Sequence, residues 1–525
     1  MSDQNAARLS LSEINAGELK EIQVGETPVL LARVGDECFA LGAYCTHYGA
    51  PLADGALIGD KIICPWHHAC FNARNGNMIE PPAIDSLPQY PLRIENGVIH
   101  IDLDGVEGDR RTPDMIKEDP ADTRKFVIIG GGGAGYMAAQ TLREEGFAGK
   151  IVMITREDRL PYDRPNLSKD YLFGQAEPEW MLLRSEEFFA EHDIDRIVGK
   201  TVTGVDIAGK KVSFDDGSDM AFDRLLVATG GAPRKLKLPG ADLGHIHTLR
   251  SFGSADDIIA SIDGAKKAAV IGASFIAMEA AAALKKRGLD VTVIAPDKVP
   301  FERTLGLEIG AVFQKIHEDN GVKFRLGNGV AGFEGDPNVS SVILASGEKV
   351  EADVVITGIG VVPETSFLSG VELHPDHGVF VDENMRIAED VYAAGDIVHF
   401  RDQRTGQTMR IEHWRTALQQ GRVAARNMAG KAAKYHAVPF FWTTEFDSTL
   451  NYLGRAAGWD EIIFKGKPET QEFLAFFVKD GLVTAVASMN RDKELAYLEG
   501  LFLSDKVPTP DEIRRDDFDV FGISQ

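Results

Sequence analysis

Two cysteines and two histidines near the N-terminus have the types and spacing that could hold an iron–sulfur cluster. Cys45 and His47 form a Cys-x-His pair, and Cys64 and His67 form Cys-x-x-His after residues 48–63. A Rieske [2Fe–2S] centre needs two thiolates on one iron and two imidazoles on the other, which two such loops would supply. Zinc is the alternative, but zinc fingers usually separate their cysteine pair from their histidine pair. The mixed pairs favour a Rieske cluster with these four ligands.

The remaining cysteines and one further histidine lie close to these ligands. Cys38 and Cys70 are expected to pack as small hydrophobic side chains. His68 directly follows a ligand, but the ligand positions are already filled, so we expect it either at the surface or packed behind the ligands. No cysteine follows position 70, which argues against a disulfide oxidoreductase or peroxidase that needs a redox cysteine beside a flavin.

A glycine-rich turn in the middle of the chain predicts a first dinucleotide site. Gly130, Gly132 and Gly135 form G-x-G-x-x-G, with Gly133 inside it, between an apolar strand and an amphipathic helix. Glycines there allow a tight turn and close approach of the backbone to a pyrophosphate at the helix N-terminus. Glu157 ends the next strand and is placed to accept hydrogen bonds from a ribose. The pattern predicts an FAD site.

A second strand–turn–helix unit about 140 residues later predicts a nicotinamide site. Its turn keeps only the first glycine, Gly272, followed by Ser274, and the later segment TGIGVVPET contains Gly360. The following strand has no carboxylate at its tip, so Asp297, two residues beyond, is the hypothetical ribose partner. The sequence offers no pair of arginines that could bind the 2′-phosphate of NADPH, so NADH is the preferred cofactor and NADPH is less favoured.

The segment 160–172, LPYDRPNLSKDYL, resembles the flavin-contacting stretch of oxygenase-type ferredoxin reductases and apoptosis-inducing-factor-like proteins. The resemblance implies that Arg164 contacts the phosphates or the flavin. It also implies that Lys169 lies near the flavin N5 and pairs with Glu279. A lysine there would stabilise charge on the reduced ring.

The same resemblance implies further contacts. Thr229 and Gly230 would form the turn where the chain crosses between domains, and Asp396 would bind the ribitol hydroxyls. His413 would lie at the edge of the ring, with a structural role as the alternative. Trp442 is a candidate aromatic wall beside the flavin.

Departures from respiratory Rieske proteins predict a low cluster potential. Those proteins have an extra cysteine in each loop, where this chain has Ala50 and Trp66. They also have hydroxyl groups that donate to sulfur, where this chain has Ala69 and Phe71. Losing those hydrogen bonds lowers the potential toward the bottom of the Rieske range of roughly −150 to +300 mV.

Changes in composition along the chain predict a multidomain fold with two doubly wound, Rossmann-like α/β domains. The expected parts are an all-β Rieske domain at 8–103, a linker at 104–124, an FAD domain at 125–247 and 372–437, an NAD(P)H domain at 248–371, and an α+β interface domain at 438–525.

Bulk composition excludes several classes of function. The formal charge of −24 over 525 residues argues against a general nucleic-acid surface, which needs a basic face. No apolar run approaches the ~20 residues of a membrane span. No signal peptide is evident at the N-terminus, so a cytoplasmic protein is expected, as a monomer or homodimer.

Together these features predict a ferredoxin–NAD⁺ reductase-like enzyme. Electrons would pass from NADH through FAD to the cluster and on to an external ferredoxin, cytochrome or oxygenase component. A mobile linker that lets the Rieske module swing is a further hypothesis. The alternative function is a redox-responsive, NADH-sensing signalling flavoprotein of the apoptosis-inducing-factor type.

A terminal oxygenase would need two histidines and a carboxylate around a mononuclear iron. His374, Asp376 and His377 form the only dense group of this kind. Their turn-like context predicts a solvated surface segment, so the oxygenase function is disfavoured.

Overall fold

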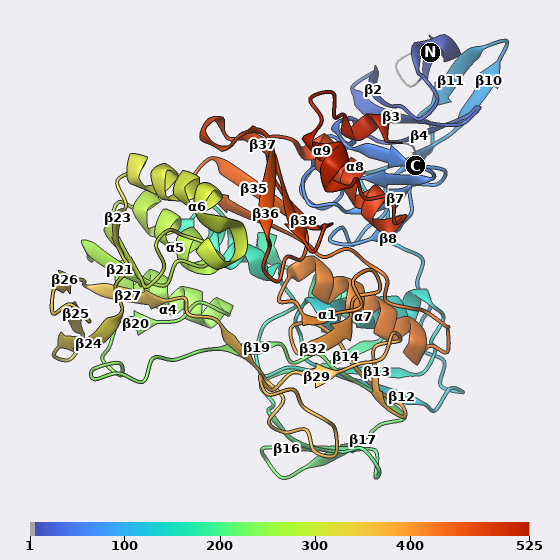
Figure 1. Cartoon of the computed structure of the whole chain (residues 1–525). Coiled ribbons are helices and arrows are strands. Elements are labelled where there is room, and N and C mark those ends of the chain that lie inside the picture. The colour runs from blue at the N-terminus through green and yellow to red at the C-terminus, as the bar shows by residue number, and fades with distance from the viewer. Residues whose placement is uncertain (1–5, 524–525) are drawn as a thin grey trace.

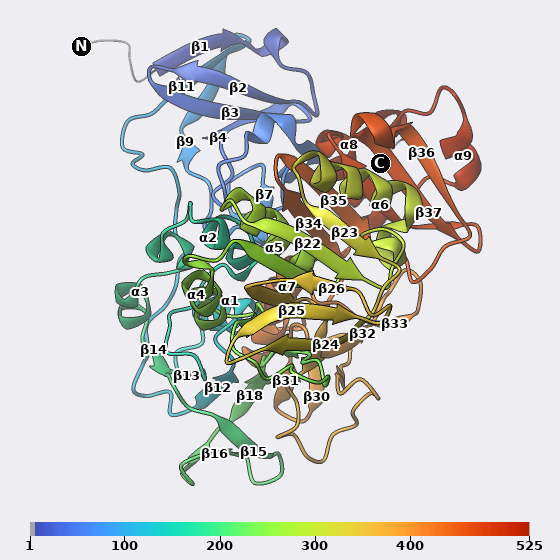
Figure 2. The same ribbon diagram turned by 90° about the vertical axis from the view of Figure 1, so that its left-hand side faces the viewer.

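The computed structural model describes residues 6–523, which fold into four connected parts (Figure 1). The N-terminal domain is drawn in blue beside the red C-terminal domain, and two α/β domains complete the molecule. The predicted fold class is confirmed: an all-β domain, two doubly wound domains and a C-terminal α+β domain. Figure 2 shows the N-terminal sheets at one end of the molecule, above the two α/β domains.

The N-terminal domain consists of three small sheets with strand orders β1-β11-β10, β2-β3-β4-β9 and β5-β6-β7-β8. Its first described strand begins two residues before the predicted boundary at residue 8. The strands are β1 Ala6–Ser10, β2 Leu19–Val24, β3 Thr27–Val34, β4 Glu37–Gly42, β5 Ala56–Ile58, β6 Lys61–Ile63, β7 Cys70–Asn72, β8 Met78–Glu80, β9 Gln89–Tyr90, β10 Leu92–Glu95 and β11 Val98–Asp102.

The first α/β domain has the sheet order β14-β13-β12-β18-β31-β30, parallel except for β30. Helices α1 and α7 pack against each other and cover this sheet. The strands are β12 Lys125–Ile129, β13 Lys150–Ile154, β14 Ile194–Ile197, β18 Arg224–Val227, β30 Arg386–Ala388 and β31 Val391–Ala393; the helices are α1 Gly133–Glu144, α2 Asp170–Phe173, α3 Glu186–Glu191 and α7 Trp414–Met428. Two short sheets lie at its rim: an antiparallel one of β15 Val202–Asp206, β16 Lys211–Phe214 and β17 Asp219–Ala221, and a mixed one of β29 Val379–Phe380, β32 Val398–Arg401 and β33 Thr408–Arg410, in which β29 and β32 are parallel.

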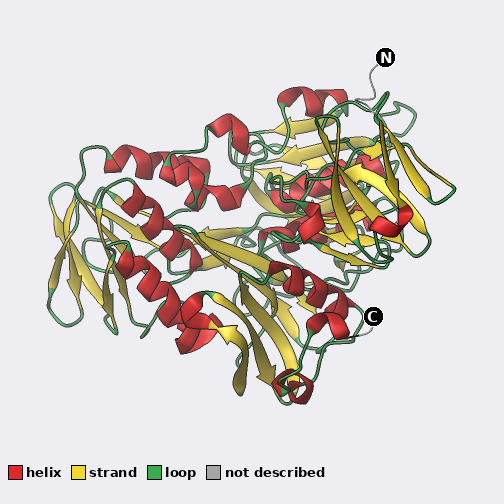
Figure 3. Ribbon diagram, turned by 90° about the horizontal axis from the view of Figure 1, so that it is seen from above, coloured by secondary structure: helices red, strands yellow, loops and turns green. Residues whose placement is uncertain are grey.

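The second α/β domain has a fully parallel sheet of order β20-β27-β21-β22-β23. Its central strands are buried apolar runs, because helices pack against one face of the sheet and a small antiparallel sheet packs against the other (helices are red and strands yellow in Figure 3). The elements are β20 Ile246–His247, β21 Lys267–Ile271, β22 Asp290–Ala295, β23 Lys323–Leu326, β27 Val354–Thr357, α4 Phe252–Ile262, α5 Phe275–Lys286 and α6 Glu302–Asp319, with a small sheet of β24 Val330–Gly335, β25 Val339–Leu344 and β26 Lys349–Glu351.

The chain leaves the first α/β domain and returns to it through a two-stranded link. β19 (Gly231–Pro233) and β28 (Val361–Pro363) pair antiparallel at this crossing. The predicted boundary after residue 247 is therefore late, because β20 pairs with β27 in the second domain. A two-residue strand has no periodicity from which a boundary could be predicted.

The C-terminal domain is a five-stranded antiparallel sheet of order β34-β35-β38-β37-β36, covered by α8. Helix α8 also contacts β5 of the N-terminal domain. The elements are β34 Phe440–Glu445, β35 Ser448–Gly454, β36 Glu461–Lys467, β37 Glu472–Lys479, β38 Leu482–Met489, α8 Asp492–Leu503 and α9 Pro510–Arg514.

The predicted linker at 104–124 has no helix or strand of its own, but it is held along its length. Arg111 and Ser86 exchange backbone hydrogen bonds of 2.8 and 2.9 Å. Further on, the Ile116 amide donates to the Arg143 carbonyl at 3.2 Å. Such backbone bonds to neighbouring domains do not depend on apolar side chains, so the polar composition of the linker gave no sign of them.

Candidate functional site

The four predicted cluster ligands lie on two loops that close in the same way. In the first loop the Cys45 amide donates to the Ala50 carbonyl at 2.9 Å, and in the second the Cys64 amide donates to the Ala69 carbonyl at 2.9 Å. The loops face each other, and Nδ1 of His47 lies 3.1 Å from Nδ1 of His67.

The protonation chemistry of these side chains fits a metal cluster. Burial lowers the pKa of His47 to about 3, so its ring is neutral and keeps a lone pair for iron. The Cys45 and Cys64 thiols are buried and interact with each other. Two thiols and two neutral imidazoles that converge in this way match the donor set of a Rieske [2Fe–2S] cluster.

No hydroxyl of the neighbouring residues 46, 69 and 71 is free to donate to the cluster position. Ala69 and Phe71 are completely buried and carry no polar atom in their side chains. The Thr46 hydroxyl instead donates to the Asp85 carbonyl at 2.8 Å. The low potential stays a prediction, and this arrangement supports it.

The histidine that follows the ligand His67 is buried behind the cluster loop, which is one of its two expected positions and excludes the other, at the surface. His68 is 0% exposed, and its Nδ1 lies 2.5 Å from a carboxylate oxygen of Glu499 on α8. The other Glu499 oxygen lies 2.7 Å from Arg415 of α7. These three residues come from three different domains, so the sequence carried no signal of their contact. Cys38 and Cys70 are buried, as predicted.

The first glycine turn has no room for side chains at its critical positions. A Cβ on Gly130 would lie 2.1 Å from the Ala228 carbonyl oxygen, and Gly130 has a φ of +121°. A Cβ on Gly135 would lie 1.9 Å from the Gly130 oxygen, and one on Gly133 would meet the Trp414 ring at 2.8 Å. At Gly132 the nearest atom is 4.0 Å away, so the N-terminus of α1 is open to a ligand.

A Gly135→Val variant is expected to lose most of its bound FAD, because its Cβ cannot avoid the Gly130 carbonyl. The ratio of flavin absorbance to protein should fall by more than half. Gly253→Ala in α4 is the control, since nothing lies within 4 Å of its Cβ position. Full flavin content in Gly135→Val would contradict the assignment of this turn.

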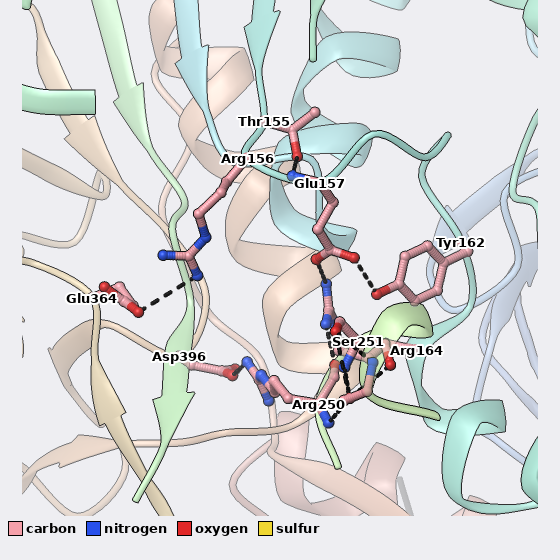
Figure 4. A network of polar contacts seen from close by, with 10 residues as sticks. Thr155, Arg156, Glu157, Tyr162, Arg164, Arg250, Ser251, Glu364 and Asp396 are labelled. Atoms are coloured by element: carbon pink, nitrogen blue, oxygen red, sulfur yellow. Dashed lines mark hydrogen bonds and ion pairs between the residues drawn. The ribbon is translucent and has the colours of Figure 1, made fainter. Parts of the chain in front are cut away.

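Arginines neutralise the carboxylates predicted to bind the cofactor sugars (Figure 4). Glu157 is 3.1 Å from Arg164 and accepts a hydrogen bond of 2.7 Å from Tyr162. Asp396 pairs with Arg250 at 2.6 Å. The sequence prediction missed Arg250 because it lies outside any recognisable motif. It meets Asp396 only because two distant segments of the chain pack together.

The crossover turn lies beside this network. Gly230 has a φ of +67°, and a Cβ there would lie 3.2 Å from the Arg250 guanidinium. The Thr229 hydroxyl donates to the Glu364 carbonyl at 2.6 Å, which ties the outgoing chain to the returning one.

A cleft of about 310 Å³ joins the cluster loops to the residues predicted to lie near the flavin. Lys169 and Glu279 form an ion pair of 2.8 Å at its wall. Trp442 also lines it, and its ring centre is 4.2 Å from that of His67. The cluster ligand, the aromatic ring and the lysine thus share one cavity.

His413 lies deep beside this region. Its ring packs 4.6 Å from that of Phe441, and burial lowers its pKa to about 3. Its Nδ1 has no hydrogen-bond partner among residues 6–523. A neutral ring with an unpaired buried nitrogen fits contact with a ligand better than a role as a proton donor.

The second turn is built like the first. Gly272 has a φ of +108°, and its Cβ would meet the Gly358 carbonyl oxygen at 2.3 Å. Ser274 precedes α5 and its hydroxyl donates to the same carbonyl at 3.1 Å. Gly360 also has a positive φ, +94°.

The predicted ribose partner Asp297 has an arginine beside it that the sequence analysis did not weigh. Arg303 Nε lies 3.0 Å from the Asp297 carboxylate and the arginine is largely exposed. Binding of the 2′-phosphate of NADPH was expected to need two arginines, and Arg303 is a single, exposed one. It nevertheless adds positive charge beside Asp297.

The predicted solvated histidine cluster is partly buried and differs in membership. Asp376 accepts from His374 at 2.9 Å and from His399 of β32 at 3.0 Å, whereas His377 is not part of the group. Arg410 also pairs with Asp376 at 2.8 Å. The guanidinium already neutralises the carboxylate, so these contacts need no metal ion.

Three family models match successive parts of the chain. The Rieske [2Fe-2S] domain matches residues 6–91, the pyridine nucleotide-disulphide oxidoreductase model matches 124–421, and the reductase C-terminal model matches 440–521. The chain belongs to the pyridine nucleotide-disulphide oxidoreductase family. It binds FAD and NAD(P)H and carries a [2Fe–2S] cluster, as predicted. The family name includes disulphide oxidoreductases, which need a redox cysteine beside the flavin. This chain has no cysteine after Cys70, so it does not carry out that reaction.

Individual relatives support the same organisation. Human apoptosis-inducing factor 3 is 37% identical over 93% of this chain and 82% of its own length. Rhodocoxin reductase from Rhodococcus erythropolis is 34% identical over 75% of this chain and 93% of its own. The putidaredoxin reductase–putidaredoxin complex matches 76% of this chain and 98% of that chain, with 30% identity and a TM-score of 0.71. The family thus makes this chain an NAD(P)H-dependent flavoprotein oxidoreductase of ferredoxin-reductase type with its own Rieske domain.

Among residues 6–523, no helix has the length and apolar character needed to cross a membrane.

Proposed function

We propose that this enzyme takes hydride from NADH and passes single electrons to its own Rieske cluster, then to an external protein carrier. The observation that carries the proposal is the 4.2 Å separation of the His67 and Trp442 rings in the cleft that contains Lys169. Bound FAD converts a two-electron donor into single electrons, which the cluster requires. The carrier class is suggested by relatives named as reductases of rhodocoxin and putidaredoxin.

The protein side chains would hold the two cofactors in a fixed relation. Asp85 of the N-terminal domain forms a buried ion pair of 2.6 Å with Arg184, and Arg415 donates to the Pro81 carbonyl at 3.0 Å. These contacts favour a docked Rieske domain for the first transfer over a swing of the linker. Covalent fusion also keeps the local concentration of cluster near flavin high.

Stopped-flow absorbance tests the proposal under anaerobic conditions. After mixing with NADH, flavin bleaching should be followed by cluster reduction at a rate that does not depend on protein concentration. A rate proportional to concentration would show transfer between molecules and would contradict the proposal.

An Asp297→Ala variant is expected to raise KM for NADH about tenfold with little change in kcat, because a ribose hydrogen bond to a charged group contributes roughly 1.5 kcal/mol. Arg303→Ala is the companion variant and should leave KM for NADH nearly unchanged. Steady-state kinetics measure both. An unchanged KM in Asp297→Ala would remove this residue from the nucleotide site.

A further inference from the structure

A buried carboxyl group in the C-terminal domain is linked to Lys169 by a line of polar side chains. Glu445 of β34 is 0% exposed, and its Oε1 lies 3.2 Å from the Thr443 hydroxyl. That hydroxyl lies 2.7 Å from Glu279 Oε1, which lies 2.8 Å from Lys169 Nζ. The line thus runs from the interior of one domain to the wall of the cleft.

Thr443 can be hydrogen-bonded to both carboxyl groups in this line only if one of those carboxyls is protonated. Thr443 has a single hydroxyl proton, so it can donate to one of the two carboxylates but not to both. Glu279 also accepts from Lys169 and, at 2.5 Å, from Ser168, as expected for the charged partner. The contact between Thr443 and Glu445 is then a hydrogen bond only if Glu445 carries a proton and donates it.

The surroundings of Glu445 agree with a neutral carboxyl group. The titratable groups that face it are Glu279 on α5, Lys169 before α2 and His317 on α6. His317 Nδ1 is 3.9 Å from Glu445 Oε2, too far for a hydrogen bond, and that oxygen has no partner among residues 6–523. Burial, and then the charge of Glu279, raise the pKa of Glu445 well above its usual value.

The ring of His317 is engaged elsewhere. Its Nδ1 lies 2.9 Å from the Phe313 carbonyl and its Nε2 lies 3.2 Å from the Met278 carbonyl. Burial lowers the pKa of His317, so its ring is neutral and has a single N–H, which donates to the nearer carbonyl, that of Phe313, and the ring supplies no permanent cation to Glu445. Among the groups that face Glu445, Lys169 therefore carries the lasting positive charge, and Thr443 and Glu279 link the two side chains.

We propose that Glu445 stores a proton that moves toward Glu279 when negative charge accumulates beside Lys169. The O–H bond of Glu445 breaks as its proton joins the Thr443 oxygen, and the Thr443 proton passes to Glu279. When the electrons leave, both transfers reverse, so no proton is gained or lost overall. This role rests on the proposed electron path, in which a hydride brings two electrons to the site before they leave singly.

Infrared difference spectroscopy of the holoenzyme, reduced with dithionite, tests the store directly. The carboxylic acid C=O band of Glu445 should lose intensity on reduction and a new acid band should appear. Both changes should be absent in Glu445→Gln. In Thr443→Val, a nearly isosteric change, the Glu445 band should remain and no longer respond to reduction. Glu472→Gln, at an exposed position on β37, is the matched control and should behave like the wild type.

An unchanged difference spectrum in Glu445→Gln would overturn the proposal, and so would a wild-type response in Thr443→Val. Because dithionite replaces NADH and no acceptor is present, this result does not depend on whether the complete electron path operates. Absence of cluster reduction by NADH would instead count against the proposed function alone.

A stability measurement gives a second readout without turnover. The pKa of Glu445 is raised in the folded state, so its contribution is fully present below the unfolded value of about 4.3 and is lost as pH rises toward the folded value. Glu445→Gln removes this loss. The Tm of Glu445→Gln minus the Tm of the wild type should therefore become larger as the pH rises from 5 to 8. A difference in Tm that does not change with pH would contradict a proton on Glu445.

Discussion

Replacing Glu499 with alanine is expected to slow cluster reduction by NADH at least tenfold while flavin reduction stays near the wild-type rate. Glu499 accepts from both His68 and Arg415, and the Arg415 side chain is only 1% exposed. Removing one partner of a buried ion pair leaves an uncompensated charge and costs about 3–5 kcal/mol. Because the three residues join three domains, that cost falls on the docked position of the Rieske domain.

Stopped-flow absorbance at flavin and cluster wavelengths measures the two steps separately. Glu461→Ala is the matched control, since Glu461 pairs with Arg514 at the surface and such pairs contribute only about 0–1 kcal/mol. Equal cluster reduction rates in Glu499→Ala and wild type would show that this buried network does not hold the docked arrangement.

Replacing Cys64 with serine is expected to abolish the Rieske signal and all electron delivery to an external carrier. A thiolate is the ligand that iron–sulfur clusters use, and serine does not replace it well. Flavin content and the rate of flavin reduction by NADH should stay within about twofold, because serine is close to cysteine in size and the glycine turns at Gly130 and Gly272 close on Ala228 and Gly358, outside the cluster domain. Iron analysis and electron paramagnetic resonance measure the loss.

Cys70→Ala provides the control for this variant. Cys70 is buried near the same loop, but its sulfur contacts the His68 carbonyl at 3.4 Å and is not in the predicted ligand set. The cluster should therefore persist. Loss of iron in Cys70→Ala together with its retention in Cys64→Ser would reverse the ligand assignment.

The sequence by itself determined the parts that depend on local spacing. Cys45, His47, Cys64 and His67 could be recognised because each pair lies within one short loop, whose closure depends on nearby backbone atoms. The glycine turns were also predictable, since close approach of the backbone excludes every side chain at Gly130. Fold class and cofactors followed from these local features.

Only the tertiary structure decided which distant side chains meet. Glu499 lies 431 residues from His68, Arg250 reaches Asp396 across 146, and Glu279 meets Thr443 across 164. Such contacts depend on how whole domains pack. The local sequence around a single polar residue in a helix or strand does not predict which distant residue it will contact. The docked Rieske domain and the proton on Glu445 are consequences of this packing, because burial and pairing set the charge that each side chain can carry.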